Sequence, residues 1–241
     1  MFERGIAIIA LTKSGVATST RIARALEKAQ IRYHIYAPES LRSDRITPFD
    51  GDLSELFGRV FKAFDAIIAV MAVGIVVRSI APYVANKMTD PAVVVVDDLG
   101  RYTISLLSGH LRGANRLTNM VAGEIGATAI VTTATELLGR KSVEAIAEEY
   151  DLTIVNLEAL TPVNSAIVND RKILFATIGS AISPEIDADH PKVISSVDQL
   201  KEMMEGYDAG IVIASSAVPL ESLTRPVALL IPRPTPRPPN D

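Results

Sequence analysis

The chain has 241 residues, a net charge of −4, 48% hydrophobic and 22% charged residues, a balance typical of a folded globular protein rather than a disordered one. It has no global basic footprint of the kind that nucleic-acid binding requires, and the absence of cysteine excludes disulfides, thiolate nucleophiles and cysteine-held metal sites. The apolar runs are too short for a membrane span and the N-terminus reads as a strand, so we expect a cytoplasmic protein with no membrane or nucleic-acid partner.

The first third of the chain alternates between buried strands and amphipathic helices. The strands are predicted at residues 5–11, 32–36 and 66–71, and the helices at residues 18–30, 53–61 and 74–80. Thr18 or Ser19 is the expected cap of the first helix. This alternation predicts a mainly parallel sheet flanked by helices.

The pattern then changes to that of a β-hairpin inserted in the sheet. Strands at residues 92–97 and 101–106 flank a short loop that ends in Gly100. A helix at residues 115–125 follows, with Asn115 as its natural N-cap and a glycine after it, and a strand at residues 128–131 comes next.

A second, smaller α/β domain is predicted after residue 138. Its strands are expected at residues 152–155, 172–178, 209–214 and 227–231, and its helices at residues 142–150 and 199–205. The predicted limits are 1–138 for the first domain, 139–231 for the second and 232–241 for a proline-rich, mobile tail.

The stretch from residue 103 to residue 136 holds the most suggestive chemistry, because two strand ends in it are rich in polar residues. His110 sits in a glycine-containing loop before a helix, where an imidazole can act as a general base or simply bond the backbone. Glu136 can orient that histidine or polarise water, and it is also a common helix-start acid. Ser108, Thr132 and Thr133 can donate to a ligand or satisfy local backbone groups.

Three cations near this stretch favour a ligand that carries carboxylates, although solvated surface charge is the simpler reading: Arg78, Lys87 and Arg112. Residues 12–15 follow the first strand, where doubly wound folds bind anions, but they match neither phosphate-binding glycine motif. We therefore predict a tight turn that forms a wall of a ligand cleft. No metal-ligand spacing occurs either, so we predict no metal held by the protein.

Ordered sequence blocks across residues 74–136 resemble the CbiG family of cobalamin biosynthesis proteins. The blocks are VRSIAP at 77–82, KMTDPAVVVVD at 87–97, ISLLSGH at 104–110, GAN at 113–115 and VTTAT at 131–135. The resemblance implies a cobalt-precorrin-5A hydrolase of anaerobic vitamin B12 synthesis, which opens the ring A δ-lactone and releases acetaldehyde. The substrate is a tetrapyrrole that brings its own cobalt, so no cofactor held by the protein is expected.

Site roles follow from this resemblance together with the residues. His110 and Glu136 are the expected catalytic pair, which would activate water. The expected substrate-binding residues, which include the oxyanion donors and the carboxylate-binding cations, are Arg78, Lys87, Ser108, Gly109, Arg112, Gly113, Asn115, Thr132 and Thr133.

The sequence departs from the family in two places. Arg112 stands where the family often has a second glycine, and the proline-rich tail stands about where the family's C-terminal domain should begin. The resemblance therefore leaves two alternatives: a hydrolase, or a non-catalytic corrinoid-binding subunit that needs a separate CbiG C-terminal-domain polypeptide. An unrelated nucleotide- or sugar-phosphate-binding protein ranks below both, because the phosphate motifs are missing.

Overall fold

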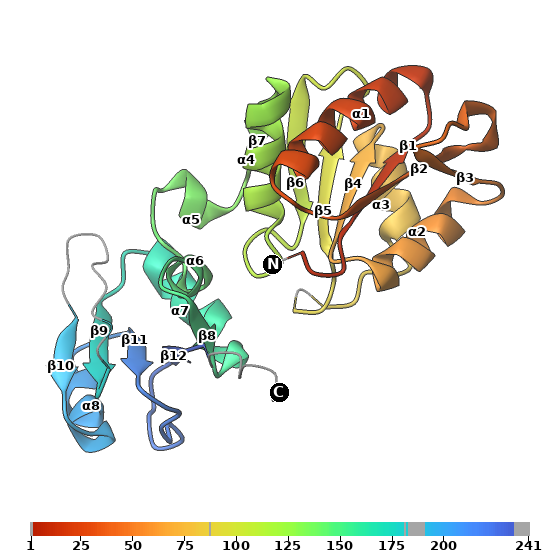
Figure 1. Ribbon diagram of the computed structural model, residues 1–241. Helices are drawn as coiled ribbons and strands as arrows, with labels where there is room; N and C mark the ends of the chain where they lie inside the picture. Colours follow the sequence, from red (N-terminus) through yellow and green to blue (C-terminus); the bar gives the residue numbers. More distant parts are fainter. Residues whose placement is uncertain (1, 87, 181, 183–190, 234–241) are drawn as a thin grey trace, which may run out of the picture. The chain divides into compact units, whose positions relative to one another are not determined.

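The computed structural model describes residues 2–86, 88–180, 182 and 191–233. The chain divides into two compact units, Met1–Thr132 and Thr133–Asp241, and each is built around its own sheet with flanking helices (Figure 1). The predicted fold class, two α/β domains with mainly parallel sheets, is confirmed. Lys87 and residues 234–241 of the predicted tail lie outside the described residues.

The first unit contains a seven-stranded sheet in the order β3-β2-β1-β4-β5-β6-β7. Its strands are β1 (Ile6–Ala10), β2 (Tyr33–Pro38), β3 (Ile46–Phe49), β4 (Ala66–Val70), β5 (Ala92–Val96), β6 (Tyr102–Leu107) and β7 (Thr128–Ile130). All neighbouring strands are parallel except β5 and β6, which are antiparallel, so the predicted hairpin is confirmed. The central strands β1, β4 and β5 are buried along their whole length, as their unbroken apolar sequences predict.

Helices cover both faces of this sheet. They are α1 (Lys13–Lys28), α2 (Leu53–Ala63), α3 (Val73–Ile80) and α4 (Ala114–Ile125), with a short 3₁₀ helix η1 (Glu39–Leu41) after β2. Helices α1 and α4 pack against one face through side chains such as Leu26 and Leu117, and α2 and α3 pack against the other through Phe57 and Val76 (Figure 1).

The predicted start of the first helix is wrong. Helix α1 begins at Lys13, and the Thr12 hydroxyl caps it by accepting the Gly15 N–H at 2.9 Å. Thr18 and Ser19, the predicted caps, lie inside the helix and are buried. Strand β3 was not predicted at all.

A β-bulge interrupts the pairing of β5 with β6. Val94 pairs with Ser105, but the next pair is Val93 with Leu107, so Leu106 is an extra residue on β6. Leu106 and Leu107 both pack against the α2–α3 side of the core, whereas Ser105 reaches the α4 side.

The second unit holds a five-stranded sheet in the order β10-β9-β11-β12-β8, parallel except for β8. Its strands are β8 (Leu152–Ile154), β9 (Ile173–Ile178), β10 (Lys192–Ile194), β11 (Ala209–Ala214) and β12 (Val227–Pro232). Its helices are α5 (Ala134–Leu137), α6 (Val143–Glu149), η2 (Leu157–Ala159), α7 (Leu160–Val168) and α8 (Val197–Met204). The predicted domain limits assign α5 to the first domain, whereas α5 packs against α7 in this unit. Strand β10 and helix α7 were not predicted.

Candidate functional site

The two ends of the first sheet carry different groups of polar residues. We call the side where β1, β4 and β5 begin the amino edge, and the side where they end the carboxyl edge. Because β6 is antiparallel to β5, β6 ends at the amino edge, and its parallel neighbour β7 ends there as well. Residues 108–113, which we call the SGH loop, therefore lie at the amino edge, as does Thr132 after β7.

The SGH loop is tied to the first turn of α4 by backbone hydrogen bonds. The Ser108 carbonyl accepts from Ala114 N at 3.2 Å, and the Gly109 carbonyl accepts from Asn115 N at 3.0 Å. His110 is partly buried, and its carbonyl accepts from Gly113 N at 3.0 Å. These bonds fix the loop that presents His110.

Asn115 is not the helix cap that the sequence predicted. Its side chain lies inside the fold, between β6 and the SGH loop. The N-cap of α4 is Gly113, whose φ of 81° favours glycine. The Asn115 side chain is 3% exposed, and its Oδ1 accepts from Ser105 Oγ at 2.7 Å. A Cβ on Gly109 would lie 2.7 Å from that Oδ1 atom, so the loop can approach α4 only because residue 109 is glycine.

Ser108 combines backbone strain with an unsatisfied polar group. Its φ is +60°, a left-handed conformation that is unfavourable for a residue with a side chain. Its hydroxyl is buried and has no hydrogen-bond partner among the described residues. Both features are uncommon in native proteins and recur at functional sites, so they make Ser108 a candidate site residue.

Arg112 connects the SGH loop to the start of β4. Its Nη2 atom lies 3.6 Å from Oδ1 of Asp65, and its Nε atom is buried without a partner among the described residues. Asp65 also accepts from the backbone N and the Nε of Arg4, each at 2.7 Å. Burial would raise the pKa of Asp65, but the hydrogen bonds from Arg4 and the charges of Arg4 and Arg112 outweigh it and hold that pKa below 3.8.

The other predicted cations and hydroxyls are distributed over two units. Arg78 is exposed in the last turn of α3, which runs from the carboxyl edge back toward the amino edge before β5 begins. Thr132 is the exposed last residue of the first unit, whereas Thr133 and Glu136 belong to the second. Glu136 is exposed in the first turn of α5, and its role as the partner of His110 stays a prediction.

The predicted cleft wall at residues 12–15 lies at the carboxyl edge, whereas His110 lies at the amino edge, at the other end of the strands. A cavity of about 500 Å³ is found there, lined by Thr12, Val73 and Ile104 among others. Its polar end is Asp98, whose carboxylate accepts from the hydroxyls of Thr12 at 2.7 Å and Ser14 at 3.3 Å. A carboxylate at the start of α1 occupies the kind of place where doubly wound folds bind phosphate, which disfavours an anion there.

Sequence reasoning missed the part that Asp97 and Asp98 play. Two adjacent residues on a strand would point to opposite faces of the sheet and could not share a site. In the structure β5 ends at Val96, and both aspartates follow it and line the carboxyl-edge cavity. Asp97 Oδ1 accepts from the backbone of Arg101 at 2.7 Å, which stabilises the hairpin turn. Two aspartates directly after a buried strand were the available signal.

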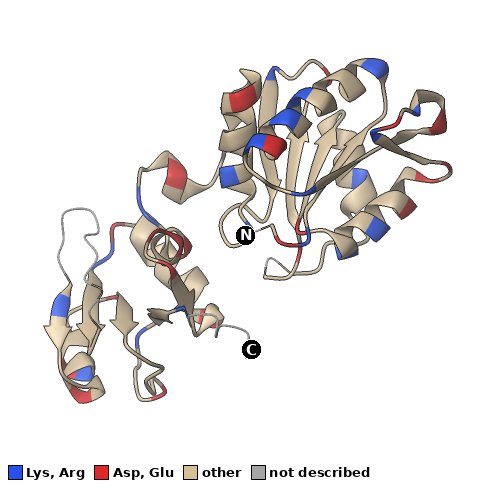
Figure 2. Ribbon diagram, in the orientation of Figure 1, with Lys and Arg blue, Asp and Glu red and all other residues tan. Residues whose placement is uncertain are grey.

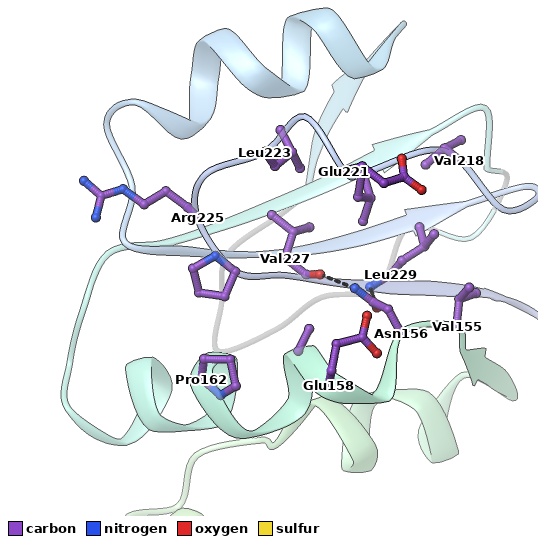
Figure 3. Close-up of a pocket in the computed structure, with 13 residues that line it drawn as sticks. Val155, Asn156, Glu158, Pro162, Val218, Glu221, Leu223, Arg225, Val227 and Leu229 are labelled. Carbon is purple, nitrogen blue, oxygen red and sulfur yellow. Dashed lines mark hydrogen bonds between the residues drawn. The ribbon is translucent and has the colours of Figure 1, made fainter.

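A second cavity, of about 400 Å³, lies within the second unit (Figure 3). It is bounded by Glu158 and Pro162 on one side and by Leu223 on the other. Asn156 also lines the cavity, and its side chain donates to the Val227 carbonyl at 2.7 Å and accepts from Leu229 N at 2.8 Å. None of the residues predicted for the site lines this cavity.

Charged residues of both signs are interspersed on each unit (Figure 2). Within the described ranges no three His, Asp or Glu side chains come close enough to hold a metal ion. None of the helices in the same ranges is long and apolar enough to cross a membrane.

Two family models match consecutive parts of the chain. Residues 55–136 match the family described as Cobalamin synthesis G N-terminal, and residues 141–234 match Cobalamin biosynthesis central region. The SGH loop, Arg78 and Asp65 all lie within the first match.

Curated relatives agree with these matches. The chain is 37% identical over 169 residues to a cobalt-precorrin-5A hydrolase of Salmonella typhimurium, covering 70% of this chain and 47% of the relative. It is 34% identical over 173 residues to a protein of the same name from Priestia megaterium, covering 71% of this chain and 46% of the relative. The chain thus spans about half the length of the curated relatives it matches.

A solved structure supports the fold. The crystal structure of a cobalamin biosynthesis protein G homologue from Sulfolobus solfataricus superposes with a TM-score of 0.54 and 24% identity, covering 96% of this chain and 61% of that one.

Proposed function

The chain belongs to the CbiG family, whose N-terminal and central regions it carries, and on that premise we propose that it acts in cobalamin biosynthesis as a cobalt-precorrin-5A hydrolase. The observation that best supports a site at the SGH loop is Ser108, with its strained backbone and its buried hydroxyl that has no partner among the described residues. Strain and unsatisfied polar groups of this kind concentrate where ligands bind and react.

The proposed first step is the hydrolysis of the ring A lactone. His110 accepts a proton from water, and the water oxygen adds to the lactone carbonyl carbon. The bond between that carbon and the ring oxygen then breaks as His110 returns the proton to the ring oxygen, which gives a carboxylic acid and an alcohol. The Ser108 hydroxyl and the backbone N–H groups of the SGH loop would donate to the oxyanion that forms on the carbonyl oxygen. Thr132, which follows the neighbouring strand at the same edge, is a further donor in this proposal.

The second step releases acetaldehyde from the freed alcohol. A base takes the alcohol proton, the O–H electron pair forms the aldehyde C=O bond, and the bond to the macrocycle breaks. The macrocycle keeps the electron pair of that bond and gains a proton. One water is consumed and one acetaldehyde is formed, so no oxidant or reductant is needed. Cobalt enters as part of the substrate in this proposal.

Cations of the amino edge would hold the carboxylates of the substrate. Arg112 and Arg78 are the described candidates, and Lys87 belongs to the same connection between α3 and β5. Guanidinium groups bind carboxylates through two parallel N–H donors, which fixes orientation as well as charge. We also propose a cytoplasmic location and a partner polypeptide that carries the C-terminal part of a CbiG protein.

The test is acetaldehyde release from cobalt-precorrin-5A under anaerobic conditions by the purified chain. We expect release by the wild-type chain, alone or after addition of the remaining C-terminal part of a curated relative, and a fall of about 100-fold for His110→Ala. His34→Ala is the matched control, because His34 lies on β2 and packs against Phe64 with ring centroids 5.6 Å apart. Full turnover by His110→Ala would remove His110 from the mechanism. No release under either condition would refute the hydrolase assignment.

A further inference from the structure

Asp65 holds together the start of the sheet and two arginines. Its backbone carbonyl accepts from Ala92 N at 3.0 Å, and its own N–H donates to the Gly5 carbonyl at 3.1 Å. Its carboxylate, 13% exposed, faces Arg4 and Arg112. Asp65 is therefore fixed to three strands at the amino edge, and Arg112 approaches it from the SGH loop.

The two arginines differ in how many of their donors are already used. Arg4 Nε donates to Asp65 at 2.7 Å, Nη1 donates to the Lys62 carbonyl at 3.0 Å, and Nη2 donates to the Phe64 carbonyl at 3.2 Å. Arg112 has one contact with Asp65, at 3.6 Å, and its Nε is buried without an acceptor among the described residues. The group of one carboxylate and two guanidiniums has a net charge of +1, and its spare donors belong to Arg112.

We propose that Asp65 is a positioning residue that aims Arg112 at a carboxylate of the substrate. This inference rests on the proposed function, because it assumes that the SGH loop binds a tetrapyrrole with several carboxylates and that Arg112 contacts one of them. Holding an arginine in place before the ligand arrives reduces the side-chain entropy lost on binding. A buried N–H donor without an acceptor destabilises the free protein, so a hydrogen bond from Arg112 Nε to a ligand carboxylate would contribute more to binding than a bond from an exposed donor.

The direction in which anion binding changes when Asp65 is neutralised distinguishes a positioning role of Asp65 from a purely electrostatic one. Removing a negative charge near an anion site should strengthen anion binding if Asp65 acts only through its field. If Asp65 positions Arg112, its removal should weaken binding, because the guanidinium is then free to leave the loop. Asp65→Asn keeps the size of the side chain and removes the charge, so it distinguishes these two cases.

The experiment titrates the purified full chain with cobyrinic acid, a corrinoid polycarboxylate, and with its fully methylated ester. We expect wild type to prefer the acid, Arg112→Gln to bind it about tenfold more weakly with ester binding unchanged, and Asp65→Asn to bind it several-fold more weakly. The double variant should bind no more weakly than Arg112→Gln alone, since Asp65 acts through Arg112. Arg112→Lys should recover only part of the loss, because lysine lacks the planar fork.

Arg4→Gln is the matched control. It removes the contact of the Arg4 side chain with Asp65 but keeps the Arg4 backbone N–H, which donates to Asp65 at 2.7 Å, so Asp65 and Arg112 stay in place. Acid binding should therefore fall less than in Asp65→Asn, while thermal stability falls. Circular dichroism confirms that each variant is folded. Equal or tighter acid binding by folded Asp65→Asn would overturn the inference, and the proposed function would still stand if wild type releases acetaldehyde. If wild type binds neither corrinoid, this inference fails, whereas the proposed function is decided separately by acetaldehyde release.

Discussion

Replacing Gly109 with alanine tests whether the SGH loop is held against α4 as described. The φ angle of Gly109 is not positive, so an alanine backbone fits and only the new methyl group matters. That methyl would lie 2.7 Å from Asn115 Oδ1 and 3.2 Å from its Cγ. Asn115 is 3% exposed and bonded to Ser105, so it cannot move aside freely.

The cost can be worked out from these contacts. Losing the bond between Ser105 and Asn115 costs about 1 kcal/mol, and the shifts that relieve the overlap cost about 1–3 kcal/mol. We therefore expect Gly109→Ala to lower the free energy of unfolding of the first unit by about 2–4 kcal/mol. Urea unfolding followed by circular dichroism, with hydrogen exchange of the Asn115 amide as a local probe, measures both effects.

Gly123→Ala on the same helix is the control. Gly123 is exposed in α4, and nothing lies within 4 Å of the place that an alanine methyl would take, so alanine should stabilise the unit by about 0.5–1 kcal/mol through helix propensity. The double change Gly109→Ala with Asn115→Ala should cost less than the sum of the two single changes, because the clash is gone. If Gly109→Ala left the free energy of unfolding unchanged, or if the two changes were strictly additive in the double variant, the described contact between Gly109 and Asn115 would be refuted.

Three further outcomes are expected. Ser108→Gly should stabilise the chain by about 1 kcal/mol in urea unfolding, because glycine accepts the φ of +60°, and it should slow acetaldehyde release. Asp98→Ala should lower stability by about 1–2 kcal/mol in thermal unfolding, because the hydroxyl of Thr12 loses an acceptor at 2.7 Å. Burial would raise the pKa of Asp65, but the hydrogen bonds from Arg4 and the charges of Arg4 and Arg112 lower it below its ordinary value. The stability that Asp65 contributes is therefore present above the ordinary pKa of an aspartate and is lost as pH falls through the lowered pKa. Unfolding titrations in acid should therefore show a steeper loss for wild type than for Asp65→Asn, and parallel curves would contradict this.

The sheet was predictable because local patterns determine most of it. Unbroken apolar runs predicted the buried strands, and Gly100 with its flanking strands predicted the hairpin. Strand β3 was missed because it contains a proline. Proline is disfavoured in the central strands of a sheet but is tolerated in an outermost strand, and β3 is the outermost strand beside β2.

The layout of the site depended on strand direction, which no local pattern contains. Residues 12–15 and the loop of His110 each follow a strand of the same sheet. They lie at opposite edges because β6 runs against β5. The contact between Arg112 and Asp65 was invisible for a related reason, since only the folded sheet brings the loop after β6 to the start of β4.

The bulge in β6 sets how far the SGH loop reaches. Leu106 adds one residue between Ser105 and the loop. Without it, Ser105 would still point to the α4 side of the sheet and Leu107 to the α2–α3 side. Deleting Leu106 would thus preserve the inside–outside order of the strand and shorten the span by about 3.3 Å. Loop length and sheet packing are therefore separable here, because deletion of one residue would change how far the SGH loop extends and would leave the side chains that face the core unchanged.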